Sequence, residues 1–240
     1  MAGRSPRARP SDRADGPPDA ALEVAVRVAR LVGRGGRAVL VGVDGRSGSG
    51  KTSLASEVAA VLEGRGVAVA LAEVEAFVPG WDGLADGVRR VAERLLAPVR
   101  DRGWAELAPW DWHAGRWSPP ARIPARGCAD VLLLVGCGST SAPCAPLLDV
   151  SVWLDLDEGE RRRRVTRREG DPGAWWRAWG RPEGLLLAER DSARLADVRI
   201  APTARRTASA SASAADEKAP VGHPVTGAQS DRSPRLSADG

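Results

Sequence analysis

The segment that most constrains this chain is the glycine-rich run at residues 45–52, which reads GRSGSGKT. It matches the pattern G-x-x-x-x-G-K-[ST] in full, with Lys51 and Thr52 at the last two positions. An apolar run at residues 38–43 precedes it and predicts a buried strand, and an amphipathic pattern follows it and predicts a helix. A chance glycine-rich turn would not need this placement, so the segment predicts a phosphate-binding loop between a strand and a helix.

Each part of this motif has a physical reason. Glycines let backbone N–H groups approach phosphates, and the following helix begins with free N–H groups and a positive dipole end. Lys51 is the only lysine between residues 20 and 202, and it supplies a mobile charge, while a Thr52 hydroxyl suits Mg²⁺. We therefore expect ATP and Mg²⁺ as cofactors. The metal ligand is expected to be Thr52, and the nucleotide contacts are expected from Gly45, Arg46, Ser47, Gly48, Ser49, Gly50, Lys51, Thr52 and Ser53.

Apolar runs alternate with helical patterns on both sides of the loop. Besides residues 38–43, four runs predict strands, namely Val67–Ala72, Val131–Val135, Val150–Leu154 and Asp197–Ile200. Late in the chain, helices are predicted at residues 158–168 and 182–195. Strands that are buried on both faces and alternate with helices predict a mostly parallel five-stranded sheet between helical layers. The expected fold is α/β, with the three layers of the P-loop NTPases.

Composition divides the chain into one domain and two tails. Residues 1–19 are rich in Arg, Pro, Asp and Gly, and residues 203–240 consist mostly of Ala, Ser, Thr, Pro and Gly with scattered charge. Neither segment can bury enough apolar surface to offset chain entropy, so both are expected to be disordered. The folded domain is expected at residues 20–202, and its stretch rich in Trp and Pro at 103–127 predicts a long functional loop.

Composition also excludes several classes of protein. Cys128, Cys137 and Cys144 lack the spacing of a disulfide framework or a zinc site, which favours a reducing compartment. No apolar run approaches the roughly 18 residues of a membrane span, and the N-terminal arginines precede no apolar stretch typical of a secretory signal. A cytoplasmic location without a membrane partner is therefore expected. The formal net charge of +4 comes from arginines spread along the chain, so nucleic acid is not expected as a partner.

The loop alone does not select a reaction, because P-loop proteins include kinases, GTPases and motors. A guanine-reading Asn-Lys-x-Asp segment is absent, since the domain has no second lysine. Motor ATPases normally end a buried strand with an acidic residue, whereas the strand at 131–135 ends in Val135. Among these classes, the two observations favour a kinase.

Four segments of the chain resemble the uridine kinase family of P-loop kinases. They are VDGRSGSGKT at 43–52, EAFVPGWDGL at 75–84, WDWH at 110–113 and RRVTR at 163–167. The Pro-Gly-Trp-Asp-Gly-Leu run is the most specific, and it looks like a divergent actinobacterial-type branch that is called uridine kinase-like. The resemblance covers about residues 36–201. It implies a nucleoside- or nucleotide-kinase-like form of the fold, with a short arginine-rich lid.

The resemblance implies transfer of the ATP γ-phosphoryl group to a hydroxyl, most simply that of a nucleoside, and thus an ATP-dependent phosphotransferase. Glu75 matches the family's carboxylate after the second strand, which accepts the hydroxyl proton and is Asp in the family. Lys51 in the loop and three arginines on a helix, Arg163, Arg164 and Arg167, match the family's phosphate-clamping groups. Alternatively, Glu75 is a solvated acid at a strand end, and the arginines form a solvated face.

The expected acceptor-binding residues are Trp81, Asp111 and His113. In the family, the segment that matches residues 110–113 contacts the nucleoside, and short polar groups beside an aromatic wall suit sugar hydroxyls and base edges. The expected partners are thus ATP and a small hydroxyl-bearing substrate. Two alternatives stay open: another acceptor, such as a vitamin precursor or a sugar phosphate, and tryptophans that only pack.

Two residues depart from the family's pattern. Val135 stands where the family's third strand has Glu, and valine offers no oxygen ligand to Mg²⁺. Val78 stands where the family has Tyr, which removes a substrate contact. These departures keep a second hypothesis open, in which the chain is a degenerate P-loop nucleotide-binding protein with a regulatory role and little or no kinase activity.

Overall fold

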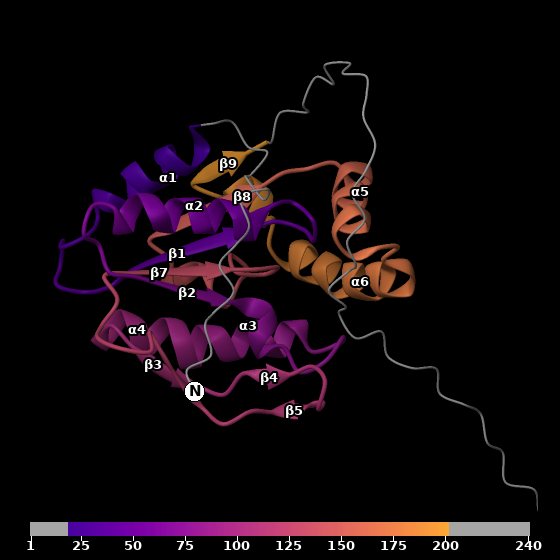
Figure 1. The fold of residues 1–240 in the computed structure, drawn as a ribbon, viewed down its shortest axis with the longest axis horizontal. Coiled ribbons are helices and arrows are strands. Elements are labelled where there is room, and N and C mark those ends of the chain that lie inside the picture. Colours follow the sequence, from indigo (N-terminus) through magenta and orange to yellow (C-terminus); the bar gives the residue numbers. More distant parts are fainter. Residues whose placement is uncertain (1–18, 202–240) are drawn as a thin grey trace, which may run out of the picture. The chain divides into compact units, whose positions relative to one another are not determined.

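The structure is a computed structural model, and it describes residues 19–201. The tail expected at 203–240, and residues 1–18 of the tail expected at 1–19, lie outside the described residues. Within residues 19–201 the main sheet has five parallel strands in the order β2-β7-β1-β8-β9 (Figure 1). Their bounds are Val39–Asp44 (β1), Val69–Glu73 (β2), Val131–Val135 (β7), Val150–Leu154 (β8) and Val198–Ile200 (β9).

The mostly parallel five-stranded sheet predicted from the apolar runs is confirmed. Every residue of the three inner strands β1, β7 and β8 is buried, as expected for strands covered on both faces. Val41 of β1 pairs with Leu133 of β7 and with Val150 of β8. This register brings the carboxyl ends of the strands to one edge, where ligands of open α/β sheets bind.

Helices cover both faces of the sheet (Figure 1). On one face, α1 (Ala20–Ala29) and α2 (Lys51–Glu63) pack through residues such as Val24, Val28, Leu54 and Val58. On the other face, α3 (Leu84–Val91), the π-helical segment η2 (Ala92–Leu96) and α4 (Ala97–Arg102) follow one another without a break. From α2 to α4, the apolar residues that repeat at helical spacing are the ones buried against the sheet, whereas in α1 Leu22 is exposed and Val24 and Val28 are buried instead.

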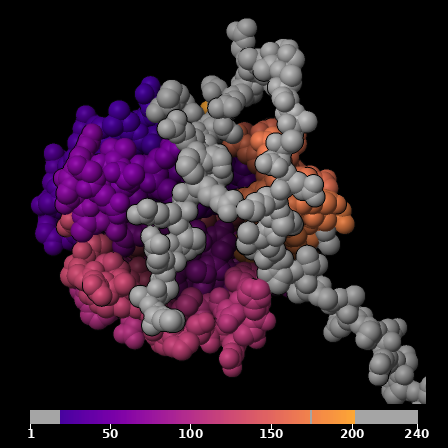
Figure 2. Space-filling view, in the orientation of Figure 1, coloured from indigo at the N-terminus to yellow at the C-terminus, as the bar shows by residue number. Residues whose placement is uncertain are grey.

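Within residues 19–201, three helices follow β8 in the sequence. They are α5 (Glu158–Glu169), α6 (Gly173–Glu189) and α7 (Ser192–Leu195). In the space-filling view, the orange residues of α5 and α6 lie beside the purple residues of the N-terminal half (Figure 2). The helix predicted at 182–195 is wrong in its bounds, because Pro182 lies inside α6 and does not begin it. The other short helices are η1 (Val74–Phe77) and η3 (Ala145–Leu147).

The stretch at 103–127, expected from its composition to be a long functional loop or an insertion, contains regular structure. It forms two short antiparallel pairs, in which β3 (Ala105–Leu107) pairs with β6 (Ala121–Ile123) and β4 (Trp110–Asp111) pairs with β5 (Arg116–Trp117). The guanidinium groups of Arg102 and Arg122 lie 4.0 and 4.7 Å from the centroid of the Trp104 ring. Such cation–π contacts and cross-strand pairs order a segment that has no apolar periodicity.

Candidate functional site

The glycine-rich loop connects β1 to α2, where its motif placed it. Gly45, Gly48 and Gly50 have φ angles of +145°, +82° and +98°, in the region that favours glycine. A Cβ at Gly48 would lie 2.6 Å from the carbonyl oxygen of Arg161, so the loop packs directly against α5. The residues expected to bind nucleotide therefore form one tight turn, at the carboxyl edge of the sheet, that only glycine permits at these positions.

The loop and the start of α2 offer hydrogen-bond donors to an anion. The first N–H groups of an α-helix have no partner within the helix, and α2 has no acidic residue in its first turn. The Ser49 hydroxyl is buried and has no hydrogen-bond partner among residues 19–201. The Thr52 side chain is exposed at the start of α2, and Ser53 is half-buried. These groups fit a triphosphate, with Thr52 as an oxygen ligand for Mg²⁺.

Lys51 is buried beneath the loop. Its ammonium donates to the carbonyl oxygens of Gly45 (2.9 Å) and Arg46 (3.4 Å) and to the Cys137 sulfur (3.4 Å). Burial by itself lowers the pKa of Lys51, but the surrounding groups, which include the carboxylates of Glu75 and Glu183, outweigh this effect and raise the pKa to about 12. Lys51 therefore carries its charge at neutral pH, as a phosphate ligand must.

Asp44, the last residue of β1, is buried and fully hydrogen bonded. Its carboxylate accepts from the backbone N–H groups of Gly45, Gly138 and Thr140 and from the Thr140 hydroxyl, at distances of 2.7–3.0 Å. Burial raises the pKa of Asp44, and these hydrogen bonds only partly offset that effect. Because its acceptor positions are used within the protein, Asp44 fixes the start of the loop against the segment after β7.

Glu75 lies in η1, directly after β2, and its carboxylate faces the loop. Its Oε1 accepts from the N–H of Cys137 at 3.2 Å, and a Cβ at Gly136 would collide with its Oε2. Burial raises the pKa of Glu75, and the nearby charge of Lys51 offsets this only in part. The carboxylate that is expected to accept the substrate's proton thus lies beside the glycine-rich loop. Its raised pKa favours proton acceptance.

Two arginines of α5 reach the loop. Arg161 is 4% exposed and donates to the carbonyl oxygen of Ser47 at 3.1 Å. Arg164 is mostly buried, and a Cβ at Gly50 would lie 3.7 Å from its Nη1. Positions 161 and 164 are three apart, so they share the face of α5 that packs against the loop.

Arg164 is one of the three arginines selected from the sequence, and the other two lie elsewhere on α5. Arg163 and Arg167 share a face, as their spacing predicted, but this face is exposed to solvent. Arg163 pairs with Glu160 on the same helix at 2.8 Å. A lid movement would be needed to bring either residue to a phosphate, so their clamping role stays a prediction.

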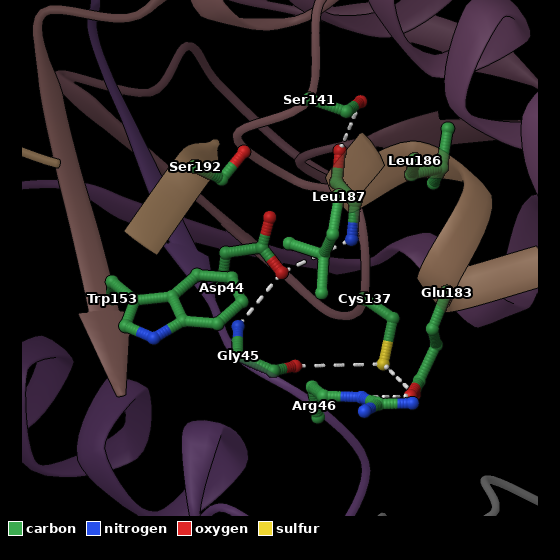
Figure 3. Close-up of a pocket in the computed structure, with 11 residues that line it drawn as sticks. Asp44, Gly45, Arg46, Cys137, Ser141, Trp153, Glu183, Leu186, Leu187 and Ser192 are labelled. Atoms are coloured by element: carbon green, nitrogen blue, oxygen red, sulfur yellow. Dashed lines mark hydrogen bonds and ion pairs between the residues drawn. The ribbon is translucent and has the colours of Figure 1, made fainter. Parts of the chain in front are cut away.

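A carboxylate from α6 also contacts the loop (Figure 3). Glu183 is 4% exposed, and its Oε1 accepts from the N–H and the hydroxyl of Ser47 at 3.0 and 2.7 Å. Its Oε2 accepts from Arg46 Nε at 3.1 Å. Burial by itself raises the pKa of Glu183, but hydrogen bonds from Cys137 and Ser47 outweigh it and lower the pKa. Glu183 is therefore a charged carboxylate at neutral pH.

Cys137 lies between the loop and α6. Burial raises the pKa of its thiol well above the ordinary value, so the thiol stays protonated and donates to Glu183 Oε1 at 2.8 Å. Cys128, Cys137 and Cys144 are all free thiols, in agreement with the absence of a disulfide framework in the sequence. Cys137 acts here as a small polar spacer that links the end of β7 to α6.

Four tryptophans from three segments meet beside Glu75, and we call them the tryptophan cluster. They are Trp81, Trp112, Trp175 and Trp179, and the centroid of the Trp81 ring lies 5.4, 6.4 and 6.1 Å from those of the other three. Trp112 Nε1 donates to the carbonyl oxygen of Glu75 at 3.1 Å. Trp81, an expected acceptor-binding residue, thus lies at the centre of an aromatic wall next to Glu75.

Asp111 ends β4, and His113 lies on the turn between β4 and β5. The Asp111 carboxylate accepts from the N–H groups of His113 and Ala114, both at 2.9 Å, and these bonds lower its pKa. The side chain of His113 is exposed. Asp111 therefore has a local role in closing this turn, and acceptor contacts from either residue stay predictions.

The residues that depart from the family's pattern are part of the core. Val135 ends β7, lies in register between Val43 and Glu73, and is 1% exposed. Val78 is fully buried against Gly87 of α3. Neither valine side chain has an oxygen that could bind a metal ion or a substrate. Side-chain oxygens for such a function must therefore come from other residues.

No protein-family model matches the sequence, and no curated protein matches it. Solved structures do match. One is a possible uridine kinase from Bacillus stearothermophilus, at 18% identity and a TM-score of 0.56, over 75% of this chain and 97% of that one. Another is described as a candidate fructose transport system kinase from Silicibacter sp. TM1040, at 20% identity and a TM-score of 0.53, over 76% of this chain and 97% of that one. This chain has the fold of the P-loop kinases.

The expected three-layer P-loop fold is thus confirmed, whereas the actinobacterial-type branch stays a prediction. At 18% and 20% identity, the likeness establishes the fold of the P-loop kinases and no more. The chemistry therefore has to be argued from the residues around the loop. In the part of the chain that the structure describes, no helix is long and apolar enough to cross a membrane.

Sequence reasoning missed three residues that contact the loop of this kinase fold: Arg161, Cys137 and Glu183. Arg161 stands four residues before Val165, the apolar residue of α5, and Glu183 also had a readable signal. It stands four residues after Trp179 and three before Leu186, so it shares the apolar face of α6 with both. A charged residue on a buried face needs a partner, and that requirement could have marked Glu183 as a site residue.

Proposed function

We propose that this chain is an ATP-dependent phosphotransferase that phosphorylates a hydroxyl of a small molecule, most specifically of a nucleoside. The observation that carries the proposal is the position of Glu75. Its carboxylate is hydrogen bonded to the N–H of Cys137, beside the buried ammonium of Lys51 in the phosphate loop. A proton acceptor and a phosphate site at one edge of the sheet are the two parts that transfer to a hydroxyl needs.

Each group has a role that follows from its surroundings. ATP, when bound, supplies the phosphoryl group, and the loop at 45–52 would hold its phosphates with Thr52 as a ligand of Mg²⁺. Lys51 and Arg164 would offset the phosphate charge from two sides of the loop. Glu75 would accept the proton of the acceptor hydroxyl at its carboxylate, because burial raises its pKa towards the range of an effective base.

The tryptophan cluster supports a nucleoside as the acceptor. Its rings lie beside Glu75, and an aromatic wall next to a catalytic carboxylate suits a planar base joined to a sugar. The name of the protein from Bacillus stearothermophilus agrees with a nucleoside. The name of the protein from Silicibacter refers to fructose, so sugars are the second class of acceptor to test beside nucleosides.

The test is ADP release in a coupled assay with a panel of nucleosides and sugars. Glu75→Gln is expected to lower the rate with the best acceptor by about 100-fold or more, because the amide cannot take the proton. ATP affinity should stay within about threefold of that of the unaltered protein. Glu106→Gln, an exposed acid on β3, serves as the matched control and should leave both values unchanged. A Glu75→Gln variant with the full rate would contradict the role of Glu75.

A second candidate function is nucleotide binding without phosphoryl transfer. It is favoured by the buried Val135, which cannot supply the oxygen that the uridine kinase family has at this position. ATP binding without ADP release for any acceptor of the panel would select this regulatory function. Acceptor-dependent ADP release would exclude it.

A further inference from the structure

Glu183 occupies hydrogen-bond donors of the loop that a phosphate group would need. Three donors of two consecutive loop residues, the N–H and hydroxyl of Ser47 and Nε of Arg46, all point to this one carboxylate. The cavity between the loop and α6, which Glu183 helps to line, has a volume of about 10 Å³ (Figure 3). Space on this scale holds about one water molecule, so the gap between Arg46 and α6 admits no larger group while Glu183 is in place.

The negative charges of Glu183 and of a nucleotide phosphate are a second reason why the two cannot occupy the loop together. Glu183 is ionised at neutral pH, and so is a nucleotide phosphate. Two anions that share donors at close range repel each other, and each donor can serve only one of them fully. The Lys51 ammonium, which would balance a phosphate, is turned towards the carbonyl oxygens of Gly45 and Arg46 instead. The donors of Ser47 and Lys51 are therefore occupied by the protein's own groups, whereas the Ser49 hydroxyl has no partner among residues 19–201.

The same helix is attached at a second point. Trp175, Trp179 and Glu183 follow one another at intervals of four residues, so they lie along one face of α6. The two tryptophans pack on Trp81, and Trp179 also lies 6.3 Å from Trp112 between ring centroids. Because α6 is one helix, withdrawing Glu183 from the loop also shifts these rings away from the wall beside Glu75.

We propose that Glu183 is an internal competitor for the anion site of the loop, which closes the ligand-free protein until a phosphate group of a nucleotide takes its donors. Release of Glu183 moves α6 and separates Trp175 and Trp179 from Trp81, so that phosphate binding and access to the acceptor side are coupled. The inference rests on the proposed function only in that the competing anion is a nucleotide phosphate.

The first test is calorimetric titration of ATP and of tripolyphosphate into the full chain and two variants. Glu183→Gln keeps the size of the side chain and an oxygen for Ser47 but removes the competing charge, so both ligands should bind about tenfold more tightly. Glu189→Gln makes the same change at an exposed position of α6 and should bind as the unaltered protein does. Melting curves without ligand check that both variants fold.

Equal or weaker ATP binding by Glu183→Gln, with normal binding by the unaltered protein, overturns this inference and leaves the proposed function standing. Weaker binding would show that Glu183 supports the bound nucleotide. If neither the unaltered protein nor the variant binds ATP, both this inference and the proposed function are overturned.

The second test follows the displacement itself in the unaltered protein by hydrogen–deuterium exchange. On addition of ATP, peptides from residues 45–52 should exchange more slowly and peptides from α6 should exchange faster. Slower exchange in both regions would mean that α6 closes onto the nucleotide, and it would also overturn the inference.

Discussion

At the scale of single residues, the geometry of the phosphate loop depends on Asp44. Its buried carboxylate holds the first loop residue and the segment after β7 in one network, through three N–H groups and the Thr140 hydroxyl. A loop with three glycines at positive φ has little stiffness of its own. The preformed shape of the site therefore comes from this acid as much as from the glycines.

Asp44→Asn is expected to lower the free energy of unfolding by about 3 kcal/mol, because the amide nitrogen would face donors instead of accepting from them. Urea denaturation measures the change, with an unaltered m-value. Asp86→Asn, an exposed residue of α3, is the control and should change stability by less than about 0.5 kcal/mol. A loss of the same size in both variants would contradict a special role for Asp44.

At the scale of secondary-structure elements, a second acid ties β1, β8 and α4 together at the opposite end of the strands. Asp149 accepts from Arg37 at 2.8 and 3.1 Å and from the N–H of Leu40 at 2.9 Å, and it pairs with Arg100 at 3.3 Å. Burial alone raises the pKa of Asp149, but Arg37 and Leu40 outweigh it and hold the pKa below the ordinary 3.8. This acid sets the register in which β1 starts beside β8.

Asp149→Asn should therefore lower the free energy of unfolding by about 1–3 kcal/mol at pH 7. Above pH 3.8 the carboxylate is charged in both the folded and the unfolded chain, so its whole contribution is present. Below that value the contribution is lost as the pH falls through the lower pKa of the folded state, and the variant and the unaltered protein should converge. Thermal unfolding between pH 7 and pH 3 measures this, with Asp101→Asn on the exposed side of α4 as the control. If the difference in stability between the variant and the unaltered protein grew as the pH fell, the expected direction of the pH dependence would be wrong.

At the scale of the whole molecule, residues 19–201 form one apolar core on each face of the sheet. A shortened chain of residues 19–202 should thus melt within about 5 °C of the full chain. It keeps Asp19, whose carbonyl oxygen accepts from the N–H of Glu23 in the first turn of α1. Differential scanning calorimetry checks the expectation. A larger fall would show that a tail contributes to the stability of the domain.

The sequence alone determined the sheet, the loop and the helix that follows it, because each of these follows from local order. A continuous apolar run predicts strands such as Val131–Val135, and glycines and a lysine at fixed spacing predict the loop. The carboxyl edge of a parallel sheet then brings Glu75 near Lys51 for any chain with this order of elements.

Only the tertiary structure decided which side chains complete the site. Glu183 meets Ser47 across 136 positions of sequence, and Arg161 meets it across 114. Spacing puts Arg161 on the face of Val165, four residues later, but it does not show that this face of α5 packs against a loop far away in the chain. Local order fixes periodicity, whereas contacts of such long separation depend on the rotation and position of whole helices, and these are set only when the layers pack together.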